Sequence, residues 1–212
     1  MIELFVSAFV TFFVVIDPPG CAPIFASLTQ GTTAAHRRSM ALRSVLIAAG
    51  ILLFFAVLGE ALLQALGVSL HAFKIAGGIM LFLIALEMVF EKRQERRSSR
   101  AEEVKKDGAA EDISVFPMGI PMIAGPGSIA SVMLMMSRYE GLTATFVVLG
   151  ALAANLLLTL LALLAAGPLM RLIGYKMEGM ITRLLGVILA ALAVQFVLDG
   201  VKATLIAELA TS

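Results

Sequence analysis

Ile16-Asp17-Pro18-Pro19-Gly20-Cys21-Ala22-Pro23 interrupts an otherwise apolar segment that begins at Met1. Each proline removes a backbone hydrogen-bond donor, clashes with the preceding helical turn and disfavours helical geometry in the residue before it. Unsatisfied backbone groups are costly in hydrocarbon, so a broken helix at membrane depth persists only where protein surrounds it or where it lines a cavity. The octet therefore predicts a broken membrane helix and a first candidate for a functional site.

The composition of the whole chain is that of a polytopic membrane protein. Of the 212 residues, 60% are hydrophobic, and the mean hydropathy is +0.99, whereas soluble domains are about 45 to 50% apolar. The N-terminus carries Glu3 and no basic region that would indicate a removable signal peptide, so we expect the first segment to remain as a membrane helix. Cys21 is the single cysteine, and no Cys/His spacing predicts a metal site.

Charged residues and turn signals divide the chain into six apolar segments, each about long enough to span a bilayer. The segment between the third and fourth spans contains seven basic and seven acidic residues, which predicts a solvated loop. The expected spans and this loop are 2–28 with the break inside it, 40–66, 73–91, the charged loop 91–112, 113–137 with a second break, 142–172 and 180–197.

The distribution of Lys and Arg predicts the orientation of the six spans. Thirteen of the sixteen basic residues fall in loops on one side, and only Lys74, Arg138 and Lys202 fall on the other. Because basic residues are enriched in cytoplasmic loops, we expect the charged loop to be cytoplasmic and both termini to be outside.

The second break, Gly125-Pro126-Gly127, aligns with Pro18-Pro19-Gly20 when the halves of the chain are laid side by side. The ends of the halves also match, since Gly78 pairs with Gly186. Because each half contains three spans, an odd number, the second half crosses the membrane in the opposite orientation. The prediction is a single all-α membrane domain, 1–212, built from two inverted three-helix repeats, 1–90 and 113–200, with broken first and fourth helices.

Interrupted segments at matching places in two inverted halves are typical of the binding site of a secondary transporter. The alternative is that each break is only a kink for helix packing, since proline and glycine are common in membrane helices. One break alone does not separate these interpretations. Two matched breaks favour transport.

The motifs of the chain, taken together, resemble those of the MarC family of bacterial and archaeal integral membrane proteins. They are Asp17-Pro18-Pro19-Gly20 with Pro23-Ile24-Phe25, Lys74-Ile75-Ala76-Gly77-Gly78, Phe116-Pro117-Met118-Gly119-Ile120-Pro121 with Ala124-Gly125-Pro126-Gly127-Ser128-Ile129, and Arg183-Leu184-Leu185-Gly186 with Val194-Gln195-Phe196-Val197-Leu198-Asp199-Gly200. The resemblance implies six spans. Because some members are assigned as transporters of small neutral amino acids such as glycine and alanine, it also implies the transporter class.

Two half-helices that begin at the breaks would each expose backbone N–H groups at the positive end of a helix dipole. Such ends suit a carboxylate, and glycine lets a ligand approach the backbone closely. No Lys or Arg lies in the middle of any expected span, so we expect the site to hold a zwitterion without a buried arginine. The expected substrate-binding residues are Asp17, Pro19, Gly20, Cys21, Gly125, Gly127, Ser128 and Asn155.

Asp17 and Asn155 each have two interpretations. Asp17 is the carboxylate expected deep in the membrane, where it would bind a proton, a cation or the substrate ammonium, or serve only as the N-cap of the following half-helix. Ala124 aligns with Asp17, so any acid role belongs to one half alone. Asn155 would present its amide to a cavity, or hydrogen-bond a neighbouring helix.

The leading hypothesis is an inner-membrane transporter that moves a small neutral amino acid by alternating access, coupled to H⁺ or Na⁺. An intramembrane enzyme is the second, but Cys21, Ser128 and Asp17 have no histidine or lysine nearby to act as a base, so we expect no catalytic residues. A passive channel or an accessory subunit is the third. Expected partners are a small-molecule substrate and the lipid bilayer, with no cofactor, metal or nucleic acid, and the oligomeric state is open.

Overall fold

The computed structural model describes residues 1–106, 112–138 and 141–209, and these residues are helical with short connections and no strand. The elements are α1 (Ile2–Ile16), α2 (Pro18–Leu28), α3 (Ala34–Ala65), α4 (Leu70–Val89), α5 (Lys92–Lys106), η1 (Ser114–Ile123), α6 (Pro126–Arg138), α7 (Leu142–Leu164) and α8 (Ala166–Leu209). Within these described ranges, five helical segments are long and apolar enough to span a membrane, or six when η1 and α6 count as one bent span. The all-helical membrane fold is therefore confirmed.

The predicted break in the first span lies at Asp17, between α1 and α2. Asp17 has φ 59° and ψ 65°, a left-handed conformation that aspartate tolerates better than most residues. Its backbone N–H ends α1 by donating to the Phe13 carbonyl (2.9 Å), and its side chain caps α2 by accepting from the Gly20 N–H (3.1 Å). Pro18 and Pro19 open α2, where the missing N–H groups are not needed.

The second predicted break separates η1 from α6, whose axes differ by 51°. The η1 segment is a π-helix rather than an α-helix, and its backbone is extended at Phe116 and Ile120, each of which precedes a proline. Prolines disfavour helical geometry in the preceding residue, which accounts for both positions. As in the first span, a new helix begins directly after the break, at Pro126.

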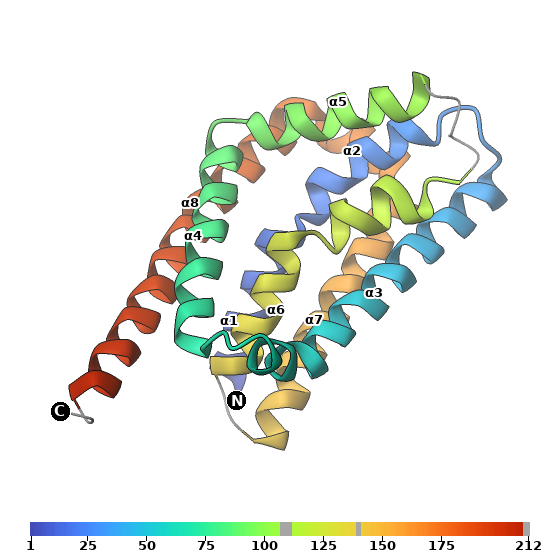
Figure 1. Ribbon diagram of the computed structural model, residues 1–212. Coiled ribbons are helices and arrows are strands. Elements are labelled where there is room, and N and C mark those ends of the chain that lie inside the picture. Colours follow the sequence, from blue (N-terminus) through green and yellow to red (C-terminus); the bar gives the residue numbers. More distant parts are fainter. Residues whose placement is uncertain (107–111, 139–140, 210–212) are drawn as a thin grey trace.

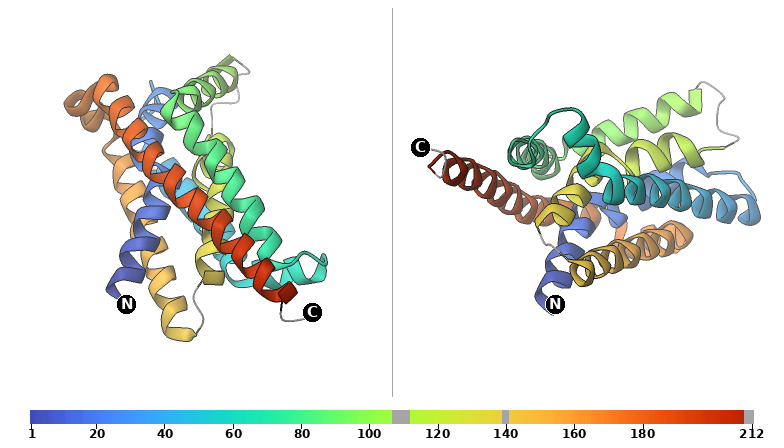
Figure 2. Two further views of the ribbon diagram at one scale, coloured as in Figure 1. Left: turned by 90° about the vertical axis from the view of Figure 1, so that its left-hand side faces the viewer. Right: turned by 60° about the horizontal axis from the view of Figure 1, so that its bottom comes forward.

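The broken segments lie in the interior of the bundle, and the unbroken helices surround them. Figure 1 shows α1 and α6 between α4 on one side and α3 and α7 on the other. The first turn of α1 and the C-terminal part of α8 lie at one end of the bundle, while α5 crosses the opposite end (Figures 1 and 2). The breaks are thus enclosed by protein, which is where broken backbone is tolerated in a membrane.

Helices α4 and α8 pack closely and in a reciprocal way. A Cβ atom on Gly78 of α4 would meet Ala193 and Val197 of α8, at 2.8 and 2.7 Å. A Cβ atom on Gly186 of α8 would meet Ala85 and Val89 of α4, both at 3.1 Å. The alignment that pairs Gly78 with Gly186 also pairs Ala85 with Ala193 and Val89 with Val197. Under this alignment, the contacts of Gly78 with Ala193 and Val197 correspond to the contacts of Gly186 with Ala85 and Val89.

Several predicted boundaries are wrong. Residues 34–39, expected in a loop, form the first turns of α3, because the Thr33 hydroxyl caps this helix by accepting from the His36 N–H (3.3 Å). Ser69 similarly starts α4 three residues earlier than expected, at Leu70. The fifth span ends at Leu164 rather than at 172, since Gly167 and Pro168 lie in the first turn of α8, where proline is tolerated. The sixth apolar span is 177–206, longer than expected at both ends.

The expectation of a solvated loop over 91–112 is also wrong. Residues 92–106 form α5, and two of its arginines, Arg93 and Arg97, are each only 8% exposed. The run of alternating charges formed a helix because Arg, Lys, Glu and Gln all have good helix propensity. Residues 107–111 of the predicted loop lie outside the described residues.

Candidate functional site

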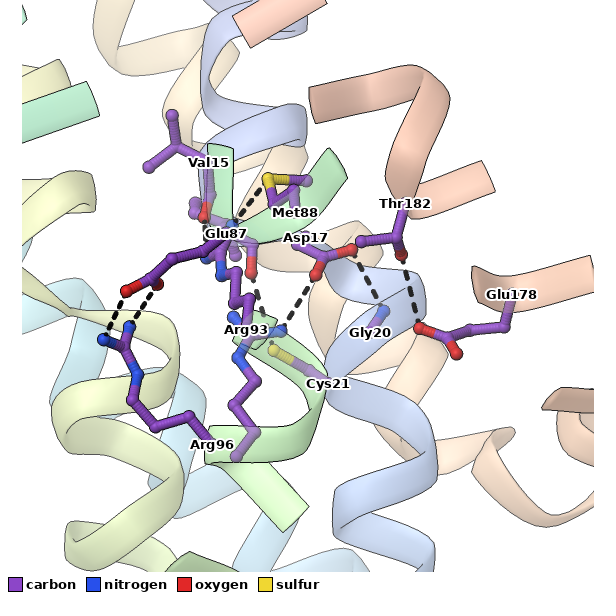
Figure 3. A network of polar contacts seen from close by, with 12 residues as sticks. Val15, Asp17, Gly20, Cys21, Glu87, Met88, Arg93, Arg96, Glu178 and Thr182 are labelled. Carbon is purple, nitrogen blue, oxygen red and sulfur yellow. Dashed lines mark hydrogen bonds and ion pairs between the residues drawn. The ribbon is translucent and has the colours of Figure 1, made fainter. Parts of the chain in front are cut away.

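Arg97 connects α5 to the break in the first span. Its Nη1 atom donates to Asp17 Oδ2 at 2.8 Å, and the side chains of Arg97 and Asp17 are 8% and 0% exposed. The other oxygen of the carboxylate, Oδ1, accepts from the Gly20 N–H. Asp17 is therefore an N-cap, as one of the two interpretations expected, and both of its oxygens also have a partner (Figure 3).

Arg93, one helical turn before Arg97, contacts the end of α1. Its Nη2 atom donates to the Val15 carbonyl at 2.6 Å, and its Nη1 atom lies 3.0 Å from the Met88 sulfur. Burial, and then the positive charge of Arg97, lower the pKa of Arg93 to about 10, so the guanidinium remains protonated at neutral pH. Because both acceptors are uncharged, its positive charge has no carboxylate partner among the described residues.

A cavity of about 470 Å³ lies between α5 and the start of α6. Four arginines of α5 line one part of it, and the broken backbone of the fourth span lines another. Its lining includes Val15, Arg93, Arg96, Arg97, Arg100, Ile120, Pro121, Gly125, Gly127 and Ser128. The cavity thus combines guanidinium groups with the beginning of a helix.

The charge of this cavity is unbalanced. Arg96 forms a bidentate ion pair with Glu87 of α4, with both N···O distances at 2.7 Å, and Arg97 pairs with Asp17 (Figure 3). For Arg93 and Arg100 the described part of the chain provides no ion pair. The cavity therefore attracts anions, and a carboxylate is the common metabolite group that guanidinium groups bind in a planar, bidentate way.

Gly125, Gly127 and Ser128, three of the predicted binding residues, lie together at the start of α6 and line the cavity. Gly125 carries no side chain, so no side chain caps the first turn of α6 from this position. A Cβ on Gly125 would lie 2.4 Å from the Pro121 carbonyl oxygen, and a Cβ on Gly127 would lie 2.5 Å from Ile84. Glycine at both positions allows the break to fold back closely on itself and on α4.

The four predicted residues at the start of α2 have a different environment. A Cβ on Gly20 would lie 2.2 Å from Asp17 Oδ2, so the space beside this glycine holds the capping carboxylate. Cys21 is buried and its thiol donates to the Ile16 carbonyl (3.5 Å), and Pro19 is half-buried. None of the four lines the 470 Å³ cavity, although Arg97 connects Asp17 to it.

Asn155 lies apart from both breaks, on the face of α7 that packs against α1. Its Nδ2 atom donates to the carbonyls of Phe9 and Ala151, both at 3.0 Å, while its Oδ1 atom is buried without a hydrogen-bond partner. Thr159, one turn later, donates to the Asn155 carbonyl (2.8 Å). The amide thus joins α7 to α1, as the second of its two interpretations expected.

The expectation that no buried arginine is available near the breaks is wrong, because Arg93 and Arg97 are supplied by the segment assigned as a loop. A signal was present in the sequence. Arg93 and Arg97 are four residues apart, as are Arg96 and Arg100, and residues at this spacing share a face of a helix. The numbers of acidic and basic residues do not reveal this face, which is visible only in the helical periodicity of the arginines.

Known proteins resemble the chain over almost its entire length. The model of a family described as "MarC family integral membrane protein" matches residues 2–205. A UPF0056 membrane protein of Methanocaldococcus jannaschii is 36% identical, over 97% of this chain and 99% of its own. The UPF0056 membrane protein YvbG of Bacillus subtilis is 37% identical, over 76% of each chain.

The UPF0056 inner membrane protein YhgN of Escherichia coli is 35% identical over 63% of this chain and 64% of its own. No solved structure matches the chain. The family model covers nearly all residues, and the M. jannaschii relative matches over nearly the full length of both chains. The chain belongs to the MarC family of integral membrane proteins.

Proposed function

We propose that this protein is a secondary transporter that moves a small neutral amino acid, such as glycine or alanine, across the inner membrane. The observation that carries the proposal is the arginine-lined cavity at the start of α6. Ligand sites of secondary transporters commonly lie where a membrane helix is interrupted. The name of the E. coli relative supports the inner membrane as the location.

The substrate carboxylate would bind between α5 and the first turn of α6. The free N–H groups of a helix start and the helix dipole both favour an anion. Arg93 adds a guanidinium whose charge is not paired with a carboxylate. At the start of α2, the corresponding position is already occupied by the carboxylate of Asp17. The start of α6 is therefore the one helix start that would bind a substrate carboxylate.

The substrate ammonium would face the carbonyl groups of η1. Ile120 and Pro121 line the cavity, and the backbone at Ile120 is extended rather than helical. Unwound carbonyls of this kind accept hydrogen bonds from cations in broken transporter helices. The cavity volume of about 470 Å³ is within the range of small-molecule sites.

Alternating access would come from two inverted repeats, 1–90 and 113–200. The packing of α4 against α8 supports this symmetry, because the contacts of Gly78 with α8 match those of the aligned Gly186 with α4. Each half also contributes a half-helix that begins at a break, α2 or α6. We further propose, from the distribution of Lys and Arg, that α5 faces the cytoplasm and that both termini are outside.

Counterflow in proteoliposomes tests the transport function. Vesicles with the full-length protein and unlabelled glycine inside are expected to accumulate labelled glycine transiently, because a carrier exchanges substrate faster than it moves net substrate. Vesicles without protein are the control, and unlabelled alanine and aspartate inside test the selectivity for neutral amino acids.

Two results would contradict the proposal. Flux that is independent of internal substrate would indicate a channel, and no flux with any of the three amino acids would exclude a transporter of this substrate class.

A further inference from the structure

A second cavity, of about 310 Å³, lies on the other side of Arg93, between α5 and α8. Its polar lining differs from that of the first cavity, because three carboxylates line it. The polar and charged lining residues are Glu91, Arg93, Gln94, Glu95, Ser98, Glu178 and Thr182. Arg93 is the lining residue that the two cavities share.

Glu178 of α8 is the buried member of this group, with only 4% of its surface exposed. Its Oε1 atom accepts from the Thr182 hydroxyl at 3.3 Å (Figure 3). The other buried carboxylate, Asp17, is paired with Arg97, whereas the described residues give Glu178 neither an ion pair nor a partner for its second oxygen. A buried carboxylate without a counter-cation is costly when ionised, and in a membrane protein it is a functional candidate.

Charged groups from four elements surround Glu178. They are Asp17 at the start of α2, Glu91 in the α4–α5 connection, Arg93, Glu95 and Arg97 of α5, and Arg183 of α8, with the Cys21 thiol nearby. Asp17 offsets the charge of Arg97, and Arg183 pairs with Glu91. Among the residues described at this cavity, Arg93 is the cation without an ion pair.

The described residues contain no group of three or more His, Cys, Asp or Glu side chains arranged to hold a metal. A proton needs only one carboxylate and a path to water. Glu91 and Glu95 are exposed at the α5 end of the cavity and provide that path.

We propose that Glu178 is the proton-binding residue that couples transport to the proton gradient, with Arg93 linking it to the substrate cavity. This inference rests on the proposed function and names its coupling ion. Arg93 and Glu178 line the same cavity, so a substrate carboxylate beside Arg93 would offset part of the positive charge near Glu178. Binding of the substrate and binding of the proton then favour each other, and the effect is reciprocal.

The cycle is a proton symport. Glu178 takes up one proton from the side to which its cavity is open as the amino acid binds. The carboxyl group stays protonated, and therefore neutral, while the protein changes conformation with the substrate bound. The proton then leaves to water on the opposite side. For one proton per glycine, a gradient of one pH unit supports about a tenfold accumulation.

Glu178→Gln tests this proposal, because the amide keeps the size of the side chain but binds no proton. In proteoliposomes with an acidic exterior, and with the membrane voltage held at zero by valinomycin and equal potassium on both sides, the wild-type protein is expected to accumulate glycine about tenfold per pH unit. The Glu178→Gln protein is expected to retain glycine exchange but to reach an internal concentration about equal to the external one. Glu95→Gln, a matched change at an exposed residue of the same cavity, is expected to behave as the wild type.

A substrate-independent measurement keeps the two proposals distinguishable. Infrared difference spectra recorded from about pH 5 to about pH 8 are expected to show a protonating carboxyl group that is absent in Glu178→Gln. The coupling role would be overturned if Glu178→Gln accumulated glycine to the same level as an exchange-active wild type. Identical infrared spectra for both proteins would overturn it as well. Failure of wild-type exchange with any of the tested amino acids would instead refute the proposed transport function, and the infrared result would still decide whether Glu178 binds a proton.

Discussion

Arg97→Ala is expected to lower the free energy of unfolding by about 3 to 5 kcal/mol, the range found when one partner of a buried ion pair is removed. The reason is that Asp17 would keep its charge at a position that is 0% exposed, with the Gly20 N–H as its remaining partner. Unfolding of the full-length protein by SDS in mixed micelles measures this loss.

Arg96→Ala provides a matched control on the same helix. Arg96 forms an equally short ion pair, with Glu87, but its side chain is 58% exposed, and exposed pairs contribute about 0 to 1 kcal/mol. The double variant Asp17→Asn with Arg97→Gln is expected to recover part of the loss, because no buried charge remains unpaired. Equal destabilisation by Arg97→Ala and Arg96→Ala would show that α5 does not hold the first break.

Gly125→Ala is expected to reduce glycine exchange by about a hundredfold, the cost of displacing binding groups by roughly 1 Å. The added Cβ would lie 2.4 Å from the Pro121 carbonyl oxygen, so the junction between η1 and α6 must open. This movement displaces the first turn of α6 relative to the arginines of α5. The initial rate of counterflow in proteoliposomes, normalised to the amount of inserted protein, measures the effect.

The matched control is Gly150→Ala in α7. Gly150 has no atom within 4 Å of an added Cβ and lies on the exposed surface of the bundle, so exchange is expected to stay at the wild-type rate. If Gly125→Ala also transports at that rate, the geometry of the second break is not part of the transport site.

The two breaks were predictable from sequence because their causes are local. Proline and glycine act on the backbone of their immediate neighbours, and the Asp17 cap involves a residue only three positions away, Gly20. Thr33 and Ser69 are local caps of the same kind. Their helices begin earlier than expected, because a hydropathy pattern reports where a helix enters the membrane and not where it begins.

The contribution of α5 was not predictable from the counts of charges. Its pairs join residues that are distant in sequence, as Arg97 contacts Asp17 and Arg93 contacts Val15. A segment with equal numbers of acidic and basic residues resembles a solvated surface unless its periodicity is examined. The burial of Glu178 was not predictable for the same reason, since α5, which is distant from it in sequence, forms one wall of its cavity.

The location of the bound carboxylate tests the account most directly. Solid-state NMR on proteoliposomes can measure dipolar recoupling between the ¹³C carboxyl of bound glycine and ¹⁵N-labelled arginine side chains. We expect strong recoupling, corresponding to ion-pair distances. It is expected to be retained in Arg138→Lys and Arg183→Lys and to be lost when Arg93 is replaced by glutamine. Recoupling that persists unchanged in Arg93→Gln would contradict carboxylate binding by Arg93. Bound glycine that shows no recoupling to any arginine would contradict a substrate site between α5 and the start of α6.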